Sequence, residues 1–228
     1  DFQPFVDLGD MPIANAFATK EELVDEYTFP MQVGFCESCC MVQLVEQPDR
    51  EKMFHENYAF FSSTSNYMKE HFKHFANSVG KLQDLNKDSF VVEIGSNDGI
   101  MLENFVASKV PCLGIEPSKN VAKVAMGKGI EVVSEFFDQD LAEKISKTHQ
   151  QADAILSANV MCHIPYMHSI YGGVKVLLKE NGVFIFEDPY LGEIIKKTSF
   201  DQIYDEHVFL FSALSVSYLA NLHGLELI

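Results

Sequence analysis

The sequence predicts an α/β fold: a doubly wound parallel sheet over residues 61–228, preceded by a small β- and loop-rich domain over residues 1–60. From residue 90 onward, short apolar runs alternate with segments of helix length, which is typical of βαβ units. One of these runs leads into a glycine-bearing turn, where such sheets present backbone amides to a ligand. The first 60 residues instead hold four prolines and three clustered cysteines, which indicates a separate domain.

Composition and charge exclude several classes of protein. The chain has 228 residues, 47% of them hydrophobic, which is enough for one sizeable domain and a small one. The net charge of 17 − 33 = −16 argues against nucleic acid, which requires a basic face, and weakly against an anionic membrane surface. No apolar run approaches the ~18 residues that span a bilayer. Five cysteines, an odd count, and a start without the basic region of a signal peptide lead us to expect a cytoplasmic protein.

The predicted elements begin with two short strands at residues 31–35 and 41–45. Residues 62–85 then predict a helix, because four apolar residues fall at helical spacing and Ser65 or a neighbouring hydroxyl residue can cap its start. Those four residues are Met68, Phe72, Phe75 and Val79.

Strands and helices are then expected in alternation, with strands at 90–94, 112–116, 131–133, 154–157 and 183–187, and helices at 100–108, 121–128, 141–147 and 167–178. Asn181-Gly182 predicts the turn that ends the last of these helices. An irregular insert, 189–212, precedes a helix over 213–223, with Gly224 at its end, and a last strand at 225–228. Because the sequence opens within a segment and stops in this strand, we expect a fragment of a longer protein.

The turn after the first of these strands carries the strongest functional pattern. Two of its residues, Gly95 and Gly99, allow the backbone to turn sharply and to approach a ligand closely. The turn lacks Gly-x-Gly-x-x-Gly and a following Gly-Lys-Ser/Thr, which disfavours a pyrophosphate cradle and favours a nucleoside cofactor without phosphates. The alternative is an ordinary strand–turn–helix. The pattern Glu-x-Gly-x-x-x-Gly resembles motif I of class I S-adenosylmethionine-dependent methyltransferases, which makes cofactor candidates of Glu93, Gly95, Asn97, Asp98 and Gly99.

Later strand ends add further candidates for cofactor binding. Glu116-Pro117 ends the second strand roughly 20 residues beyond the turn, where a carboxylate can accept both ribose hydroxyls. A solvent-facing glutamate is the alternative. Phe136, after the third strand, could pack on adenine, although an aromatic residue there is more often part of the core. Asn159, after the fourth strand, could bond the amino-acid part of the cofactor.

The candidate catalytic residues stand in two places. His163 follows the fourth strand, where it could face a substrate or be a satisfied loop histidine. Tyr204, Glu206 and His207 stand among large apolar residues in the insert, and partial burial shifts pKa values toward acid–base roles. Histidine is the natural general base near neutral pH. A surface turn with routine charges is the alternative reading of this cluster.

A Cys-x-x-Cys pair, Cys36 and Cys39, stands between the two short strands of the N-terminal domain. Such a hairpin holds two thiolates at the spacing of zinc ligands, whereas a redox pair normally opens a helix. A closed structural site requires four ligands, and His55 or Cys40 could contribute. Cys36 and Cys39 are therefore candidate ligands of structural zinc, and the second knuckle that would complete such a site is missing from this sequence.

Together these segments resemble the deoxysugar C-methyltransferase family, whose members methylate C3 of nucleotide-linked keto-deoxysugars. Residues 8–17 (LGDMPIANAF) and 36–44 (CESCCMVQL) are similar to the zinc-binding domain of that family. Residues 93–99 (EIGSNDG) are similar to its cofactor turn, and residues 204–208 (YDEHV) to its catalytic segment, the most family-specific of these motifs.

The resemblance implies S-adenosylmethionine as cofactor, zinc in the N-terminal domain, and a nucleotide-linked keto-deoxysugar as substrate. It implies that His207 is the base, that Tyr204 and Glu206 surround the sugar, and that His163 is a second active-site histidine. Tyr58 matches a substrate-side tyrosine. The upstream Cys-x-x-Cys and the C-terminal domain of the family are not in this sequence, in keeping with the expected fragment.

Two other functions remain open at this stage. One is an O- or N-methyltransferase that acts on another small molecule, in which His207 removes a proton from a hydroxyl group. The other is a non-catalytic module that binds S-adenosylmethionine or zinc. The polar cluster at residues 204–207 disfavours the non-catalytic module. The atom that receives the methyl group distinguishes an O- or N-methyltransferase from a C-methyltransferase.

Overall fold

The computed structural model describes residues 2–15, 17–48 and 60–228, so that His55 and Tyr58 lie outside the described residues. The chain divides into two compact units. The first unit comprises residues 1–54, 159–167 and 188–228, and the second comprises residues 55–158 and 168–187. The segments that carry Tyr204, His207 and His163 thus belong to the same unit as the N-terminal strands.

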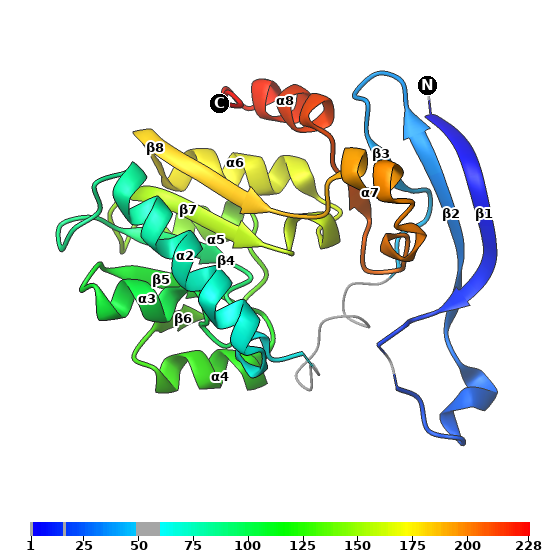
Figure 1. Cartoon of the computed structure of the whole chain (residues 1–228), viewed down its shortest axis with the longest axis horizontal. Coiled ribbons are helices and arrows are strands. Elements are labelled where there is room, and N and C mark those ends of the chain that lie inside the picture. The colour runs from blue at the N-terminus through cyan, green and yellow to red at the C-terminus, as the bar shows by residue number, and fades with distance from the viewer. Residues whose placement is uncertain (1, 16, 49–59) are drawn as a thin grey trace. The chain divides into compact units, whose positions relative to one another are not determined.

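The second unit is built on a five-stranded parallel sheet with the order β6-β5-β4-β7-β8 (Figure 1). Its strands are β4 (Val91–Ile94), β5 (Cys112–Ile115), β6 (Glu131–Val133), β7 (Ala152–Ala158) and β8 (Leu178–Glu187). From the central β4 the chain continues to β5 and β6 at one edge, and then returns to place β7 and β8 on the other side of β4. The strand order therefore reverses between β4 and β7. The predicted doubly wound sheet is confirmed, and ligands of such sheets bind beyond the carboxyl ends of the strands at this reversal.

Helices cover both faces of this sheet (Figure 1). They are α2 (Asn66–Leu82), α3 (Leu102–Ala107), α4 (Lys119–Gly127), α5 (Gln139–Ile145) and α6 (Met167–Leu177). Ser65 caps α2 as expected, since its Oγ accepts the Met68 N–H at 3.3 Å. Phe72 and Val79 of α2 pack with Val91 and Leu156 in one apolar cluster, whose burial holds the helix against the sheet.

The first unit contains a four-stranded antiparallel sheet of order β1-β2-β3-β9. Its strands are β1 (Phe2–Pro12), β2 (Thr28–Cys36), β3 (Val42–Leu44) and β9 (Phe209–Leu210). The predicted short strands are present, and the structure adds β1, which sequence reasoning did not find. Pro4 and Pro12 are tolerated there because β1 is an edge strand, with β2 as its one partner among the described residues. The insert supplies β9 and helix α7 (Leu191–Lys197) to this unit, and helix α8 (Ala213–Leu222) follows it.

Two predicted features are wrong. Asn181-Gly182 is no helix-ending turn, because β8 begins at Leu178 directly after α6. Ala152 pairs with Leu178 and Ala154 with Val183, so residues 179–182 form an irregularity within the strand, and tertiary pairing overrides the local turn signal. Residues 225–228 form no strand, since they have no ladder partner among the described residues.

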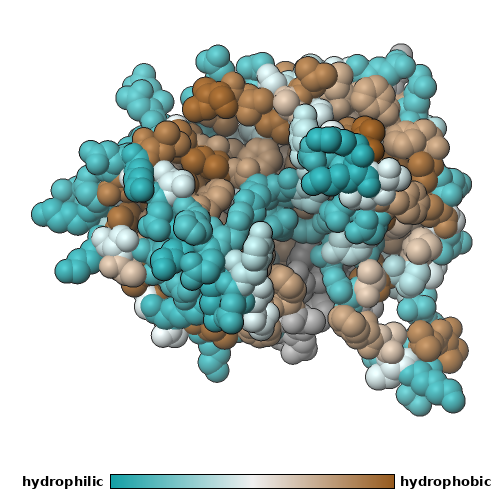
Figure 2. All heavy atoms as spheres, viewed as in Figure 1, coloured by the Kyte–Doolittle hydropathy of each residue, from teal (hydrophilic) through white to brown (hydrophobic). Residues whose placement is uncertain are grey.

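Hydrophilic side chains cover much of the visible surface, with hydrophobic patches between them, as Figure 2 shows. This agrees with a net charge of −16. Within the described ranges, no helix has both the length and the hydrophobicity needed to cross a membrane.

Candidate cofactor and catalytic sites

The turn after β4 requires glycine at both predicted positions. Gly95 and Gly99 have φ values of 71° and 78°, in the region that favours glycine. The N–H groups of Gly95 and Ser96 both donate to the Ile115 carbonyl, at 2.8 and 3.2 Å. A Cβ on Gly99 would clash with Ile130 Cδ1 and lie 3.1 Å from Ala125 Cβ, so a larger residue would require the Ile130 side chain to move.

Glu116, at the end of β5, is fixed by the backbone. Its Oε2 accepts the Asn97 N–H at 3.0 Å, and its Oε1 accepts the Ser118 N–H at 2.7 Å. Burial raises the pKa of Glu116, although these N–H donors partly oppose the rise. A carboxylate has about four lone-pair sites, so one remains on each oxygen for a pair of hydroxyl donors such as those of ribose.

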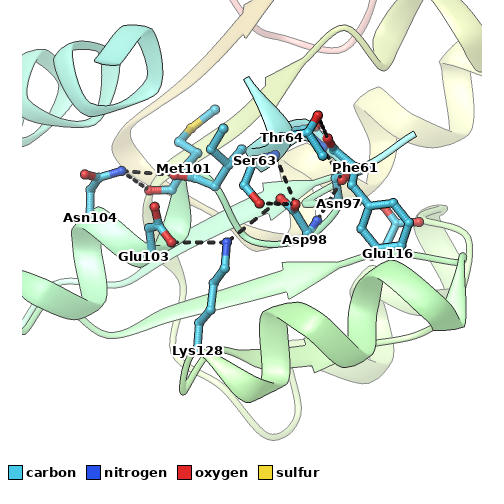
Figure 3. Close-up of polar contacts among 12 residues, drawn as sticks. Phe61, Ser63, Thr64, Asn97, Asp98, Met101, Glu103, Asn104, Glu116 and Lys128 are labelled. Carbon is cyan, nitrogen blue, oxygen red and sulfur yellow. Dashed lines mark hydrogen bonds and ion pairs between the residues drawn. The ribbon is translucent and has the colours of Figure 1, made fainter. Parts of the chain in front are cut away.

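Asn97 and Asp98 hold residues 60–63 against the turn (Figure 3). Asn97 Oδ1 accepts the Ser62 N–H at 3.0 Å, and Asn97 Nδ2 donates to the Phe60 carbonyl at 3.1 Å. Asp98 Oδ2 accepts the N–H and the hydroxyl of Ser63. Sequence reasoning assigned both side chains to the cofactor, whereas these contacts also give them a scaffolding role.

Buried polar atoms surround the turn. Glu93 is 3% exposed, and burial, together with the carboxylates of Glu116 and Asp98, raises its pKa well above the usual range. Within the described part of the chain, Glu93 Oε2 and Ser96 Oγ have no hydrogen-bond partner. Because buried polar atoms are nearly always paired, these two atoms fit a site that receives a polar ligand.

Three other cofactor candidates lie at strand ends. Pro117 and Phe136 are half-buried, and Phe136 stands in the segment after β6. Asn159 is exposed, directly follows β7, and has a φ of 53°. Their contact with the cofactor stays a prediction.

In the first unit, two histidine rings are held by backbone carbonyls. His163 Nδ1 lies 2.6 Å from the Glu206 carbonyl oxygen, and His207 Nδ1 lies 2.8 Å from that of Gln202. A carbonyl oxygen only accepts, so each Nδ1 carries a proton and donates it. In the neutral rings, the lone pair is therefore on Nε2. The ring centroids are 5.2 Å apart.

His207 has the electrostatic setting of a base. Burial lowers its pKa, and His163 lowers it further, against opposing effects of the Gln202 carbonyl and Glu206. The ring is therefore neutral at pH 7. The Tyr204 ring meets it edge-on, with centroids 4.7 Å apart, so the structure brings together the predicted Tyr204, Glu206, His207 and His163.

Residues 14 and 15 fix the Asp205-Glu206 pair. Asn15 Nδ2 donates to Glu206 Oε1 at 2.6 Å, and the Ala14 N–H donates to Asp205 Oδ2 at 3.3 Å. Both acidic residues are 2% exposed, and burial raises the pKa of Asp205. Sequence reasoning quoted Asn15 only within the zinc-domain motif. The Asn15 side chain is an amide, which is not a usual zinc ligand, and this could have indicated a role other than metal binding.

Asp188 and Cys162 form a hydrogen-bonded pair near His163 that sequence reasoning did not select. Asp188 Oδ1 accepts the Cys162 N–H at 3.2 Å. Burial raises the pKa of Asp188 to about 6, and burial with the Asp188 carboxylate raises that of the Cys162 thiol well above its usual range. Asp188 directly follows β8, and an acidic residue after a parallel strand was a usable signal.

The Cys36–Cys39 knuckle lies in the turn between β2 and β3. The Cys40 N–H donates to the Cys36 carbonyl at 2.8 Å, and the Cys36 N–H to the Met41 carbonyl at 2.9 Å. Hydrogen bonds from the backbone and thiol of Cys39 lower the pKa of the Cys36 thiol, whereas burial raises that of Cys39. Stabilisation of the Cys36 thiolate fits metal binding, and the two thiols would supply two of the four ligands that a structural site requires.

Comparisons with known proteins agree with these features. Residues 63–228 match the family model described as "Methyltransferase domain", and residues 1–54 match "Putative zinc binding domain". The C-methyltransferase NovU of Streptomyces niveus is 31% identical over 229 residues, which cover 100% of this chain and 54% of NovU. The chain thus spans about half the length of this curated relative.

Solved structures share the fold. A SAM-dependent methyltransferase from Archaeoglobus fulgidus is 15% identical with a TM-score of 0.53, covering 67% of this chain and 68% of that one. One from Thermotoga maritima is 19% identical with a TM-score of 0.50, covering 69% and 73%. The predicted class I methyltransferase fold is confirmed, as is an N-terminal segment of the zinc-binding type.

Substitution of Glu116 by Gln should weaken binding of S-adenosylhomocysteine roughly 10- to 100-fold, because hydrogen bonds to a charged group contribute about 1.5–3 kcal/mol. Isothermal titration calorimetry measures the dissociation constant, and thermal unfolding of the ligand-free variant checks its fold. Glu180→Gln, at an exposed position, is the control. An unchanged dissociation constant for Glu116→Gln would contradict the ribose role.

Asn15→Ala should lower the free energy of unfolding by about 1–3 kcal/mol, because it removes the amide that pairs with the buried Glu206 carboxylate. Urea denaturation measures this change. Gln3→Ala is a matched control, since Gln3 makes the same amide–carboxylate bond with Glu37 in an exposed setting. That variant should stay within about 0.5 kcal/mol of the parent chain. Equal losses for both variants would refute the role of Asn15.

Proposed function

We propose that this chain, which belongs to the methyltransferase-domain family, transfers the methyl group of S-adenosylmethionine to a carbon atom of a sugar. The observation that carries the proposal is the state of His207: a neutral imidazole whose Nδ1 proton is held by Gln202, and whose lone pair is on Nε2. Methyl transfer to carbon needs a base of this kind, because the proton must first leave that carbon.

The turn after β4 and the end of β5 would hold the cofactor. Glu116 would accept the ribose hydroxyls with the lone pairs that its backbone donors leave available. Gly95 and Gly99 would let the backbone approach the ligand, and Asn159 would bond the amino-acid part. Bound S-adenosylmethionine supplies a methyl group on a positively charged sulfur, which an electron-rich carbon can accept.

His207 would remove the proton from the carbon next to a ketone of the substrate. The proton moves to Nε2, while the other proton stays on Nδ1 and keeps its hydrogen bond to the Gln202 carbonyl. The charge of Glu206 favours the imidazolium that results, because it raises the pKa of His207. The His207 ring is thus neutral before proton removal, and its charged form is stabilised by Glu206 afterwards.

As the proton leaves, negative charge develops on the ketone oxygen, and a hydrogen-bond donor there lowers the barrier. Tyr204 can provide an O–H donor beside His207. His163 is less suited to this role, because its Nδ1 proton is already donated to the Glu206 carbonyl. We therefore assign the oxygen contact to Tyr204.

A nucleotide-linked keto-deoxysugar is the proposed substrate. The similarity of residues 204–208 to the catalytic segment of sugar C-methyltransferases supports it, as does the match to NovU, a C-methyltransferase. Incubation with keto-sugar nucleotides and methyl-labelled S-adenosylmethionine tests it. Carbon-13 NMR separates a carbon-bound methyl group from the oxygen- or nitrogen-bound one that other methyltransferases would form, and a product without label on carbon would refute the proposal.

His207→Gln should lower kcat roughly 10²- to 10⁴-fold, the usual contribution of a general base, with binding of S-adenosylhomocysteine unchanged. In D₂O, with S-adenosylhomocysteine in place of the methyl donor, the parent chain should exchange the substrate proton next to the ketone, and the variant should not. NMR follows this exchange. His74→Gln, on the exposed face of α2, is the histidine control. Continued exchange in His207→Gln would show that another group is the base.

Tyr204→Phe should lower kcat by roughly 10²- to 10³-fold with little change in KM, because it removes one donor to the developing oxyanion but keeps the ring against His207. Steady-state kinetics separate kcat from KM. Tyr218→Phe, on α8 and 44% exposed, is the control. A kcat equal to that of the control would assign the oxyanion contact elsewhere.

A further inference from the structure

Three side chains with metal-binding chemistry converge in the first unit. The sulfur of Cys162 and one ring nitrogen each of His163 and His207 lie within 4.8 Å of one another. We propose that these residues form a second metal site, separate from Cys36 and Cys39, which takes a divalent cation that prefers sulfur and nitrogen ligands, such as Zn²⁺.

Both histidines are already oriented as metal ligands. A ligating histidine almost always donates its other ring N–H to a carbonyl or carboxylate, which fixes the tautomer and the ring orientation. His163 and His207 do this with the carbonyls of Glu206 and Gln202, at 2.6 and 2.8 Å. In its neutral form, each ring thus carries its lone pair on Nε2, a nitrogen that can bind a metal ion.

The cysteine is held in the same manner. Cys162 lies in the 3-10 turn η3 (Met161–His163), and its backbone N–H donates to Asp188 Oδ1 at 3.2 Å. Asp188 thus restrains the turn that carries two of the three ligands, the role of an outer carboxylate in metal sites. Its negative charge favours a cation beside it, although the same charge and the burial of Cys162 raise the pKa of the thiol that the cation must deprotonate.

The spacing suits a tetrahedral ion. Zinc bonds of about 2.0–2.1 Å to nitrogen and 2.3 Å to sulfur place neighbouring ligands about 3.4–3.6 Å apart. Small side-chain rotations would bring the three atoms from within 4.8 Å to that spacing. Cys162 is buried, whereas both histidines are half-buried, so the cation would enter from the imidazole side and keep a fourth position for water or a substrate oxygen.

Occupancy would inhibit methyl transfer, a consequence that rests on the proposed function. The His207 Nε2 lone pair cannot both bind a metal ion and accept a substrate proton. Binding also replaces the thiol proton of Cys162 by the metal and releases that proton to solvent. The metal and the reaction would therefore compete for one nitrogen atom.

Titration with Co²⁺ tests the site on the full chain, because cobalt–thiolate complexes absorb in the near ultraviolet. Comparison with Cys162→Ala isolates the absorption of this thiolate, since both proteins share Cys36 and Cys39. The substitution keeps the backbone N–H that Asp188 accepts. We expect the parent chain to bind one more Co²⁺ than the variant. Loss of the Cys162 ligand should lower the affinity of the variant for Co²⁺ at this site by at least about 100-fold. Cys112→Ala, at a half-buried thiol in β5, is the control.

Equal cobalt stoichiometry and equal spectra for Cys162→Ala and the parent chain would overturn the site. Cys162→Ser gives a second comparison if the alanine variant misfolds, which circular dichroism reveals. Zn²⁺ should inhibit methyl transfer by the parent chain more strongly than by Cys162→Ala, and Mg²⁺ should inhibit neither. The cobalt spectra do not depend on turnover, so an inactive chain that binds the extra ion would refute the proposed function and leave the site intact.

Discussion

The hydrogen bonds from His163 and His207 to two backbone carbonyls determine what these side chains can do. Each bond, at 2.6 and 2.8 Å, assigns the proton to Nδ1 and the lone pair to Nε2. The carbonyls belong to residues 202 and 206, so the tautomers depend on the backbone between them. On either side of His207, Asn15 Nδ2 donates to the Glu206 side chain, and the Leu44 N–H of β3 donates to the Val208 carbonyl at 2.9 Å. The N-terminal segment and β3 thus contact both neighbours of the proposed base.

The second unit uses the same device for a carboxylate. Glu116 is oriented by the N–H groups of Asn97 and Ser118, and Asn97 reaches this position with a φ of 48°, which asparagine tolerates better than most residues. In both units, the main chain fixes a side-chain group before any ligand binds. Groups held in this way need little reorganisation on binding or during reaction, which favours both affinity and rate.

Sequence patterns predicted the parallel sheet well, because its strands are buried on both faces and read as continuous apolar runs. They missed β1, whose residues are mostly exposed and whose extended form depends on pairing with β2. The clusters at residues 93–99 and 204–207 could be found from the sequence, because their members are neighbours in the chain. Asn15 was invisible as a partner of Glu206, because 191 positions separate them. Asp188 and Cys162 come together only when the chain folds.

One nitrogen atom thus carries two incompatible roles. With Nδ1 bonded to Gln202, the neutral His207 ring has a single lone pair, and a proton and a metal ion exclude each other there. The features that make His207 a good base, a neutral ring and a fixed tautomer, are also those that make it a good ligand. Cys162 favours metal binding at this site, because its thiolate raises the affinity for zinc and takes no part in proton removal. A chain with alanine at this position would keep the base and lose the third ligand, so the two roles can be separated at one residue that the proposed reaction does not use.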